Sequence, residues 1–262
     1  MSPPIERLKK ASRQRLIVAE LSTSATIRTS NLAQRLGVSA ETVRRDLEEL
    51  TERGLVNRTY GGAAGRHVGI QPEIVDRVVM AVSERQRIGR RAAELVQPGD
   101  VVMIDSGSTT THFAQALARV ADDVTVITNS FGVANALVDQ SAIRVIFCPG
   151  DFSGRERGVY GPETTAFLER FNADVAFLGA SGLTVDGPTD VETQACWVKR
   201  TMLGRADRSV LLADASKFDI KRLEVICSWN ELSDFITDAA PPHRLGEQVQ
   251  ASGVRLHVAP SG

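Results

Sequence analysis

The chain of 262 residues is poor in several residue types, and each shortage argues against a class of protein. Its three cysteines, Cys148, Cys196 and Cys227, lie far apart and form no Cys-x-x-Cys pair, which argues against a disulfide framework or a zinc site. Their apolar surroundings favour buried thiols in a reducing compartment. The four histidines are scattered without the spacing of metal ligands, so we expect no metal and no cofactor.

Long apolar runs are also missing. No run approaches the roughly 18–20 residues of a membrane span, and the first residues, "MSPPIERLKK", lack the apolar core of a signal peptide. We therefore expect a cytoplasmic protein with no membrane partner. Apolar residues nevertheless make up 42% of the chain, so a sizeable core is possible, in one large domain or two smaller ones.

Net charge is small, at −1, but the charges are unevenly distributed. Residues 1–66 hold 12 Lys/Arg against 7 Asp/Glu, whereas the remainder holds 19 against 25. A basic N-terminal segment beside a mildly acidic body suggests an anion-binding module joined to a domain of another kind.

The N-terminal segment predicts three short helices. Residues 12–22 form the first, and the second follows an extended turn, with Thr29 or Ser30 as its cap and Gly37 as the glycine that ends it. The third begins at once, with Ser39 as its N-cap. Its apolar residues recur at helical spacing and should pack on the first two helices: Val43, Leu47 and Leu50.

The third helix carries two adjacent arginines away from its apolar stripe. Thr42, Arg44 and Arg45 lie off that stripe, and we expect Asp46 and Glu48 to share the polar surface. A solvated helix face would accept this pattern. A helix-turn-helix would also use it, because its second helix enters the major groove of DNA.

The following residues favour the second interpretation. "GLVNRTYGGAAG" predicts a strand, a tight Gly61-Gly62 turn and a second strand, which together make a wing. Three short helices, a basic groove helix and a basic wing are typical of a module that binds double-stranded DNA. The candidate DNA-binding residues are Ser39, Thr42, Arg44, Arg45, Arg58, Thr59 and Tyr60.

The chain divides into a predicted winged helix-turn-helix domain (1–65), a linker (66–73) and a body (74–262). In the body, a long helix over roughly 74–96 precedes short apolar runs at 101–105, 124–128, 143–148, 174–179, 209–214, 224–229, 234–239 and 254–259. Several runs alternate with helical segments at 110–120, 131–139 and 193–206. This alternation predicts an α/β domain whose mostly parallel sheet is covered on both faces.

Polar and glycine-rich loops follow five successive predicted strands. Ligands of parallel sheets collect outside the carboxyl ends of the strands, and free helix N–H groups, hydroxyls and a lysine suit a phosphate or carboxylate. An ordinary capped turn is the alternative at the first loop. The candidate effector-binding residues are Asp105, Ser106, Gly107, Ser108, Thr109, Thr110, Asn129, Gly150, Gly161, Gly182 and Lys217.

The motifs resemble those of the DeoR-type family of bacterial transcription repressors over essentially the whole chain. The N-terminal match rests on "VS" (38–39), "TVRRDL" (42–47) and "RTYGGA" (58–63). The body matches through "DSGST" (105–109), "TN" (128–129), "PG" (149–150), "GVYG" (158–161), "GASG" (179–182) and "DASKF" (214–218). The resemblance implies a body folded like ribose-5-phosphate isomerase and the CoA transferases, and a phosphorylated sugar or polyol as effector.

Two residues depart from the family pattern. Pro149 replaces the first glycine of a pair, and Trp197 stands where an acidic residue is more common. Both would reshape the sugar end of the pocket. We also expect a homo-oligomer, a dimer or tetramer, because one helix-turn-helix reads too few base pairs for useful specificity.

Two alternatives to a repressor that senses a sugar phosphate stay open on the sequence. The first is a sugar-phosphate isomerase or deaminase, which needs a positioned acid and base. Asp105, Asp151 and Glu192 are possible carboxylates, but no local motif fixes a pair, so no catalytic residue is assigned. The second is a repressor that answers to a non-phosphorylated ligand.

Overall fold

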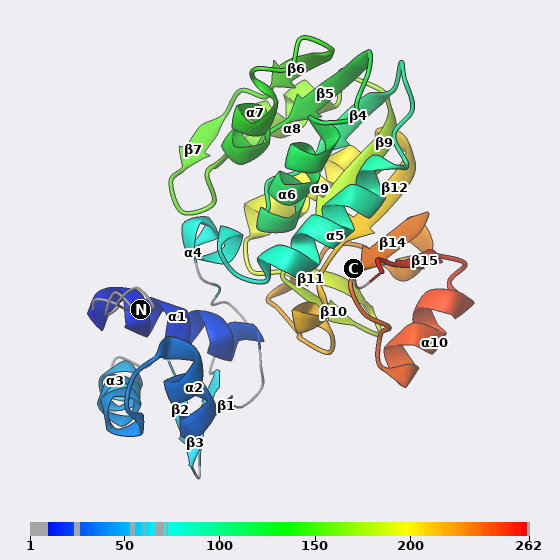
Figure 1. The fold of residues 1–262 in the computed structure, drawn as a ribbon. Helices are drawn as coiled ribbons and strands as arrows, with labels where there is room; N and C mark the ends of the chain where they lie inside the picture. Colours follow the sequence, from blue (N-terminus) through cyan, green and yellow to red (C-terminus); the bar gives the residue numbers. More distant parts are fainter. Residues whose placement is uncertain are drawn as a thin grey trace. The chain divides into compact units, whose positions relative to one another are not determined.

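The computed structural model describes residues 10–23, 27–52, 56–59, 61–65, 71 and 73–260. The chain divides into two compact units, Met1–Pro72 and Glu73–Gly262 (Figure 1). Among the described helices, none is both long and apolar enough to cross a lipid bilayer.

The N-terminal unit combines helices with a small antiparallel sheet. Its elements are α1 (Lys10–Thr23), β1 (Ile27–Arg28), α2 (Thr29–Leu36), α3 (Ala40–Glu52), β2 (Val56–Thr59) and β3 (Gly62–Gly65). The strands pair in the order β1-β3-β2. Three helices followed by a β2–β3 hairpin confirm the predicted winged helix-turn-helix.

One apolar core holds this unit together. Its fully or nearly buried members come from all three helices and from β2: Ile17, Leu21, Leu32, Leu36, Val43, Leu47, Leu50 and Val56. Gly37 makes the turn between α2 and α3 with a φ of 63°, a left-handed conformation that a glycine adopts without steric cost. The Oγ of Ser39 accepts the Thr42 N–H at 3.1 Å, which confirms Ser39 as the cap of α3.

The start of α2 differs from the prediction. Neither Thr29 nor Ser30 caps this helix, because Thr29 is its first residue and Arg28 occupies the cap position without a side-chain hydrogen bond. Instead, the Thr29 N–H donates to the carbonyl of Gly61 at 3.0 Å. The turn of the wing therefore supplies the acceptor that a capping side chain would provide.

The position of Asp46 also corrects the prediction. Asp46 is 2% exposed and does not share the polar surface of α3. The guanidinium of Arg13 donates to it through two nitrogens, and one of these bonds, from Nη2 to Oδ1, measures 3.1 Å. This two-point pair joins α1 to α3, so the first acidic residue after the two arginines serves packing rather than solvation.

The C-terminal unit is organised around a seven-stranded sheet whose neighbours all run parallel (Figure 1). In spatial order its strands are β15 (Arg255–Val258), β14 (Asp234–Thr237), β12 (Ala206–Leu212), β9 (Ala173–Gly179), β4 (Val101–Ile104), β5 (Val124–Thr128) and β6 (Ile143–Phe147). Together with the N-terminal module, this sheet confirms the predicted fold class.

Helices cover both faces of the sheet, as the continuous apolar strands predict. The helices α5 (Val82–Ala93), α6 (Ser108–Leu117) and α7 (Phe131–Leu137) pack on one face. The helices α8 (Pro162–Leu168), α9 (Thr193–Leu203) and α10 (His243–Ala251) pack on the other. Side chains alternate accordingly: Val102 and Ile104 of β4 face α5 and α6, while Met103 faces α8 and α9.

Two predictions within the body are wrong in detail. The expected helix over 74–96 is broken into α4 (Ile74–Val78) and α5, and Ala81 lies between them with a φ of 46°. The expected strand at 224–229 is reduced to β13 (Glu224–Val225), which joins a separate antiparallel sheet with β10 (Gly182–Thr184) and β11 (Gly187–Asp190). A short 3-10 helix, η2 (Trp229–Glu231), begins where the rest of that strand was expected.

The order of strands fixes where a ligand site can form. From β4 the chain proceeds outward through β5 and β6, and from β9 it proceeds in the opposite direction through β12, β14 and β15. The carboxyl ends of β4 and β9 therefore border the switch point of the sheet, the usual place of a ligand crevice. A hairpin of β7 (Asp151–Ser153) and β8 (Gly158–Tyr160) follows β6 near this edge.

Candidate functional site

The exposed side of α3 carries the predicted recognition residues. The side chains of Arg44 and Arg45 are 56% and 76% exposed, and their closest carboxylate is Glu41, at 3.4 and 3.6 Å. Such surface ion pairs are weak, so a DNA phosphate can replace Glu41 as the partner of either arginine. A groove of about 630 Å³ runs beside them, lined by Arg13, Ala33, Gln34, Gly37, Val38, Ser39 and Thr42.

The predicted wing residues follow α3. Arg58 and Thr59 belong to β2, where they pair with Ala63 and Gly62 of β3, and Tyr60 lies outside the described residues. A Cβ atom on Gly62 would lie 2.1 Å from the carbonyl oxygen of Ile27, so β3 approaches β1 more closely than a side chain permits.

At the switch point, Asp105 follows β4 directly and is 1% exposed. Its Oδ1 accepts the N–H of Gly179 at 3.1 Å, and its Oδ2 lies 2.8 Å from the Nζ of Lys199. Lys199, from α9, also donates to the Oδ2 of Asp190 at 3.0 Å. Asp105 therefore ties two strand ends and a helix together, and its oxygens are engaged by the protein itself.

Two carboxylates face one ammonium in this buried triad. Although burial opposes the charged form, Asp105 and Asp190 together raise the pKa of Lys199 well above its usual value. Burial raises the pKa of Asp105, whereas Lys199 lowers the pKa of Asp190 against the effect of burial. Ser181 extends the group by donating its hydroxyl to the Oδ1 of Asp190 at 2.8 Å.

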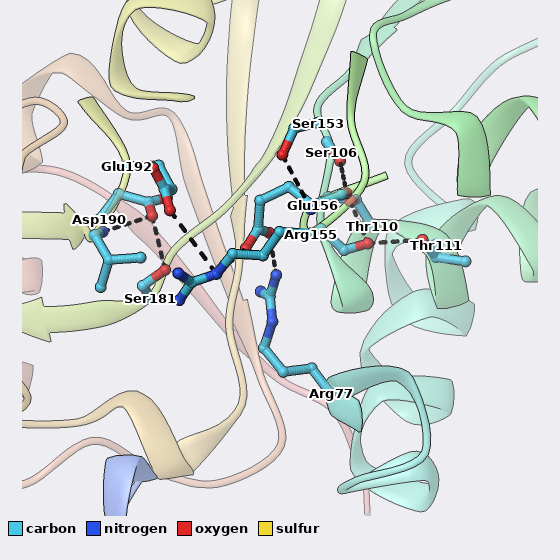
Figure 2. A network of polar contacts seen from close by, with 12 residues as sticks. Arg77, Ser106, Thr110, Thr111, Ser153, Arg155, Glu156, Ser181, Asp190 and Glu192 are labelled. Atoms are coloured by element: carbon cyan, nitrogen blue, oxygen red, sulfur yellow. Dashed lines mark hydrogen bonds and ion pairs between the residues drawn. The ribbon is translucent and has the colours of Figure 1, made fainter. Parts of the chain in front are cut away.

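The hydroxyl-rich loop after β4 is largely bonded to itself and to the β7–β8 turn (Figure 2). Ser106 donates to the carbonyl of Glu156 at 3.0 Å, Thr110 to that of Asp105 at 2.9 Å, and Thr111 to that of Gly107 at 2.7 Å. These hydroxyl protons are therefore engaged. The donors left for an anion include the N–H groups that open α6, at Ser108, Thr109 and Thr110, which have no acceptor within the helix.

Lys217 lies in the loop after β12 and is 4% exposed. Burial lowers its pKa to about 8, helped by the charges of Arg85, Arg77 and Arg222 and opposed by Asp214. All three arginines are themselves buried. The positive charge of three guanidiniums thus acts on a buried lysine, and a ligand anion would offset it.

Two carboxylates hold the arginines in position. The Nε of Arg85 donates to the Oδ2 of Asp214 at 3.0 Å, and Arg77 forms a buried ion pair with Glu156. Figure 2 shows Arg77 reaching Glu156 from below, and the adjacent Arg155 lying between Glu156 and Glu192. The Nε of Arg155 is 3.9 Å from Glu156 and 4.0 Å from Glu192.

Other predicted effector residues have packing roles as well. The Nδ2 of Asn129 donates to the carbonyl of Val159 at 3.0 Å, and within the described chain its buried Oδ1 has no hydrogen-bond partner. A Cβ on Gly150 would lie 2.1 Å from the Thr164 hydroxyl, and one on Gly182 would lie 2.1 Å from the Ile220 carbonyl oxygen. Close approach thus explains both glycines without a ligand.

Gly161 opens α8 with a φ of 106°, a conformation that side chains disfavour. Of the predicted set, the structure groups Asp105 to Thr110 in the turn between β4 and α6, and Lys217 is buried in the loop after β12. Gly150 instead precedes β7 and lies close to Tyr160 and Thr164, and Gly161 lies between β8 and α8.

Sequence reasoning missed several members of the site: Arg77, Arg85, Glu156, Ser181, Asp190, Lys199 and Arg222. One of them left a signal in the sequence. Lys199 shares the buried face of α9 with Ala195, Cys196 and Met202. A lysine at an apolar position of an amphipathic helix indicates a buried carboxylate partner.

Two family models match the chain, one in each unit. Residues 13–67 match the DeoR-like helix-turn-helix domain, and residues 80–239 match the DeoR C terminal sensor domain. A solved structure of ribose 5-phosphate isomerase A from Methanocaldococcus jannaschii aligns at 20% identity and a TM-score of 0.36, over 51% of this chain and 52% of that one.

Named relatives align over nearly the full length. The glycerol-3-phosphate regulon repressor of Escherichia coli strain K12 is 30% identical over 90% of this chain and 93% of its own. The HTH-type transcriptional regulator GlpR of Haloferax volcanii is 34% identical over 94% of this chain and 96% of its own. With a DeoR helix-turn-helix followed by a DeoR sensor domain, the chain belongs to the DeoR family of transcription regulators and is not an enzyme.

Proposed function

We propose that the chain represses a carbohydrate catabolic operon and leaves its operator when a phosphorylated sugar or polyol binds. The observation that carries this proposal is the group of buried cations formed by Lys217, Arg77, Arg85 and Arg222. Asp214 and Glu156 offset part of this charge, and a phosphate adds further negative charge there, which an uncharged sugar does not. The name of the E. coli relative, glycerol-3-phosphate regulon repressor, agrees with a phosphorylated polyol.

In this proposal the phosphate lies between the start of α6 and Lys217. The N–H groups of Ser108, Thr109 and Thr110 donate to it, with the positive end of the α6 dipole behind them. Lys217 adds a point charge. The remainder of the ligand extends toward Asn129, whose unpartnered Oδ1 accepts a sugar hydroxyl, and toward Gly182.

The DNA-binding residues are proposed from α3 and the wing. Ser39, Thr42, Arg44 and Arg45 face the major groove, and the wing residues Arg58, Thr59 and Tyr60 contact the backbone or the minor groove. The repressor acts as a dimer or tetramer on double-stranded operator DNA in the cytoplasm.

The two functions are coupled in this proposal through α4 and α5. Arg77 belongs to α4 and Arg85 to α5, and these helices follow the boundary between the two units directly. Arg85 also donates to the carbonyl of Arg77. A ligand phosphate that draws either arginine from its carboxylate therefore shifts the segment that leads to the DNA-binding unit, and so changes operator affinity.

Calorimetric titration of the full chain tests the effector class. The panel is glycerol 3-phosphate, glucose 6-phosphate and fructose 1-phosphate, beside glycerol, glucose and fructose. A phosphorylated ligand should bind to the wild type. Lys217→Met should weaken the affinity for this ligand about tenfold or more because a charge-assisted contact is lost. Lys221→Met, which removes an exposed lysine nearby, should bind as the wild type does.

The protonation of Lys217 gives this test a second readout. A bound phosphate raises the pKa of Lys217 above its value of about 8, so binding near pH 9 should take up a proton. The measured heat should then depend on the ionisation enthalpy of the buffer in the wild type and not in Lys217→Met. A plain sugar that binds as tightly as its phosphate ester would contradict the proposed effector class.

A further inference from the structure

A second cluster of arginines lies outside the strand-end site. Arg87, Arg90 and Arg91 lie at i, i+3 and i+4 on one side of α5, away from the buried side that carries Ile88. They line a pocket of about 520 Å³, which is closed by the last strand of the sheet. The remaining lining residues are Glu94, His257, Val258 and Pro260.

The arginines of this pocket are incompletely compensated. Arg87 lies 3.7 Å from Asp238, and its buried Nε has no hydrogen-bond acceptor among the described residues. Arg91 pairs with the exposed Glu94. Exposed Arg90 has no carboxylate within 4.0 Å in the part of the chain that the structure describes. Three guanidiniums thus face one carboxylate of the lining, Glu94.

The wall opposite the arginines is rigid. Arg91 lies 3.1 Å from the Nδ1 of His257, and because arginine can only donate, that nitrogen accepts. The proton of the neutral imidazole is therefore on Nε2, which donates to the Oδ1 of Asp234 at 2.7 Å. Asp234 also forms ion pairs with Arg208 and Arg255. These contacts hold the ring of His257, and with it the guanidinium of Arg91, in position without a ligand.

We infer that this pocket binds a phosphate-sized dianion, either free phosphate or the phosphoryl group of a larger molecule. Planar guanidiniums match the oxygens of a phosphate, and Arg90 and Arg87 offer unused N–H donors. The volume holds a phosphoryl group with room for an attached moiety. The inference rests on residues distinct from the proposed effector site and does not require it.

The pocket is connected to the Lys217 loop by one carboxylate. The Oδ2 of Asp238 faces Arg87, while its Oδ1 accepts the N–H of Ala215 at 2.7 Å. Ala215 lies two residues before Lys217, in the same short helix η1 (Ala215–Lys217). An anion that draws Arg87 away from Asp238 therefore changes the hydrogen bond that anchors this loop, which makes the pocket a candidate regulatory site.

The test is a titration of the full chain with inorganic phosphate. Binding is monitored by NMR through the ring resonances of ¹⁵N-labelled histidine. Chloride replaces phosphate to hold ionic strength constant, and the pH is fixed. His257 lines the pocket, whereas exposed His243 on α10 serves as an internal reference. The resonance of His257 should shift and saturate, and the amide resonance of Ala215 should shift with the same midpoint.

Variants assign the shift to the pocket. Arg90→Ala should raise the dissociation constant about tenfold. Arg90 is exposed and forms no ion pair with any described residue, so the variant should stay folded. Arg119 is an exposed arginine after α6, and Arg119→Ala should leave the dissociation constant for phosphate unchanged. Lys217→Met, at the proposed effector site, should also leave it unchanged. No saturable shift of His257, equal affinity in Arg90→Ala, or loss in Lys217→Met would each overturn the inference.

Discussion

At the scale of single residues, the fold disfavours the charged form of Lys217. Its pKa is lowered to about 8, chiefly by burial. Between that value and the usual one near 10.5, the unfolded chain keeps a proton that the folded chain has lost. Unfolding therefore takes up a proton in this window, and the stability of the folded state rises with pH across it.

Lys217→Met should consequently stabilise the ligand-free protein at neutral pH. The advantage over the wild type should shrink by about 3 kcal/mol as the pH rises from 7 to above 10, because the wild-type lysine becomes neutral. Urea denaturation at a series of pH values measures both free energies of unfolding. Lys221→Met is the matched control, and an advantage that did not change with pH would show that folding does not lower the pKa of Lys217.

Arg44 and Arg45 should affect DNA binding without affecting folding. Both side chains are exposed, so alanine at either position should leave the melting temperature within about a degree of the wild type. Loss of a phosphate contact should reduce the salt slope by about one, and loss of a base contact should cost about 1–3 kcal/mol. A double variant with wild-type operator affinity and salt slope would rule out α3 as the groove helix.

The sequence indicates some site residues better than others. Lys217 and the loop at Ser106 follow apolar strands directly, so their position at a sheet edge is predictable. Asp190 and Glu156 are not, because each meets its partner on another element of the fold: Asp190 of β11 pairs with Lys199 of α9, and Glu156 pairs with Arg77 of α4. Asp46 was misjudged for the same reason: its partner, Arg13, lies on another helix.

At the scale of elements, the break between α4 and α5 is the main departure from the expected pattern. Helical spacing continues through this segment without glycine or proline, yet Ala81 adopts a φ of 46°. That conformation lets Arg77 and Arg85 reach Glu156 and Asp214 from two separate helices. Tertiary ion pairs, which periodicity does not report, therefore outweigh local helix propensity here.

Ala81→Gly tests this strained position. A left-handed alanine costs about 1–2 kcal/mol, and the added freedom of glycine in the unfolded chain offsets about half of that. The variant should therefore be more stable than the wild type by about 0.5–1 kcal/mol in chemical denaturation. Ala116→Gly, within α6, should be less stable by a similar amount. If both variants were less stable than the wild type, the backbone at Ala81 would not be strained.

The expected strand at 224–229 shows a different limit. Its apolar residues Ile226 and Cys227 are buried as predicted, but they pack in the core of α10 and η2 rather than in the main sheet. The following Ser228 and Glu231 form a capping box, which is a signal in the sequence for a helical turn. The apolar residues of a segment therefore predict that it is buried. They do not predict which elements it packs against, because that depends on the whole fold.

At the scale of the whole molecule, the layered α/β architecture was predictable because buried parallel strands leave continuous apolar runs. The switch point between β4 and β9 was not, since strand order depends on which helices cross which face. It is this order that gathers Asp105, Gly179 and the Lys217 loop at one edge of the sheet.

We also expect self-association of the complete chain. One helix-turn-helix contacts too few base pairs for genomic specificity, so paired modules should read half-sites about one helical turn apart, or a multiple of that. Light scattering on the operator complex at micromolar concentration should give two or four chains. A single chain on a full operator would contradict this expectation.

The central claim is that effector and operator bind to different arrangements of the same molecule. The direct measurement is reciprocal: operator affinity with and without saturating effector, and effector affinity with and without saturating operator. Effector and operator should each weaken binding of the other by the same factor, about 5–150-fold, and Lys217→Met should abolish both changes while still binding DNA. An effector that binds tightly but leaves operator affinity unchanged would contradict the account.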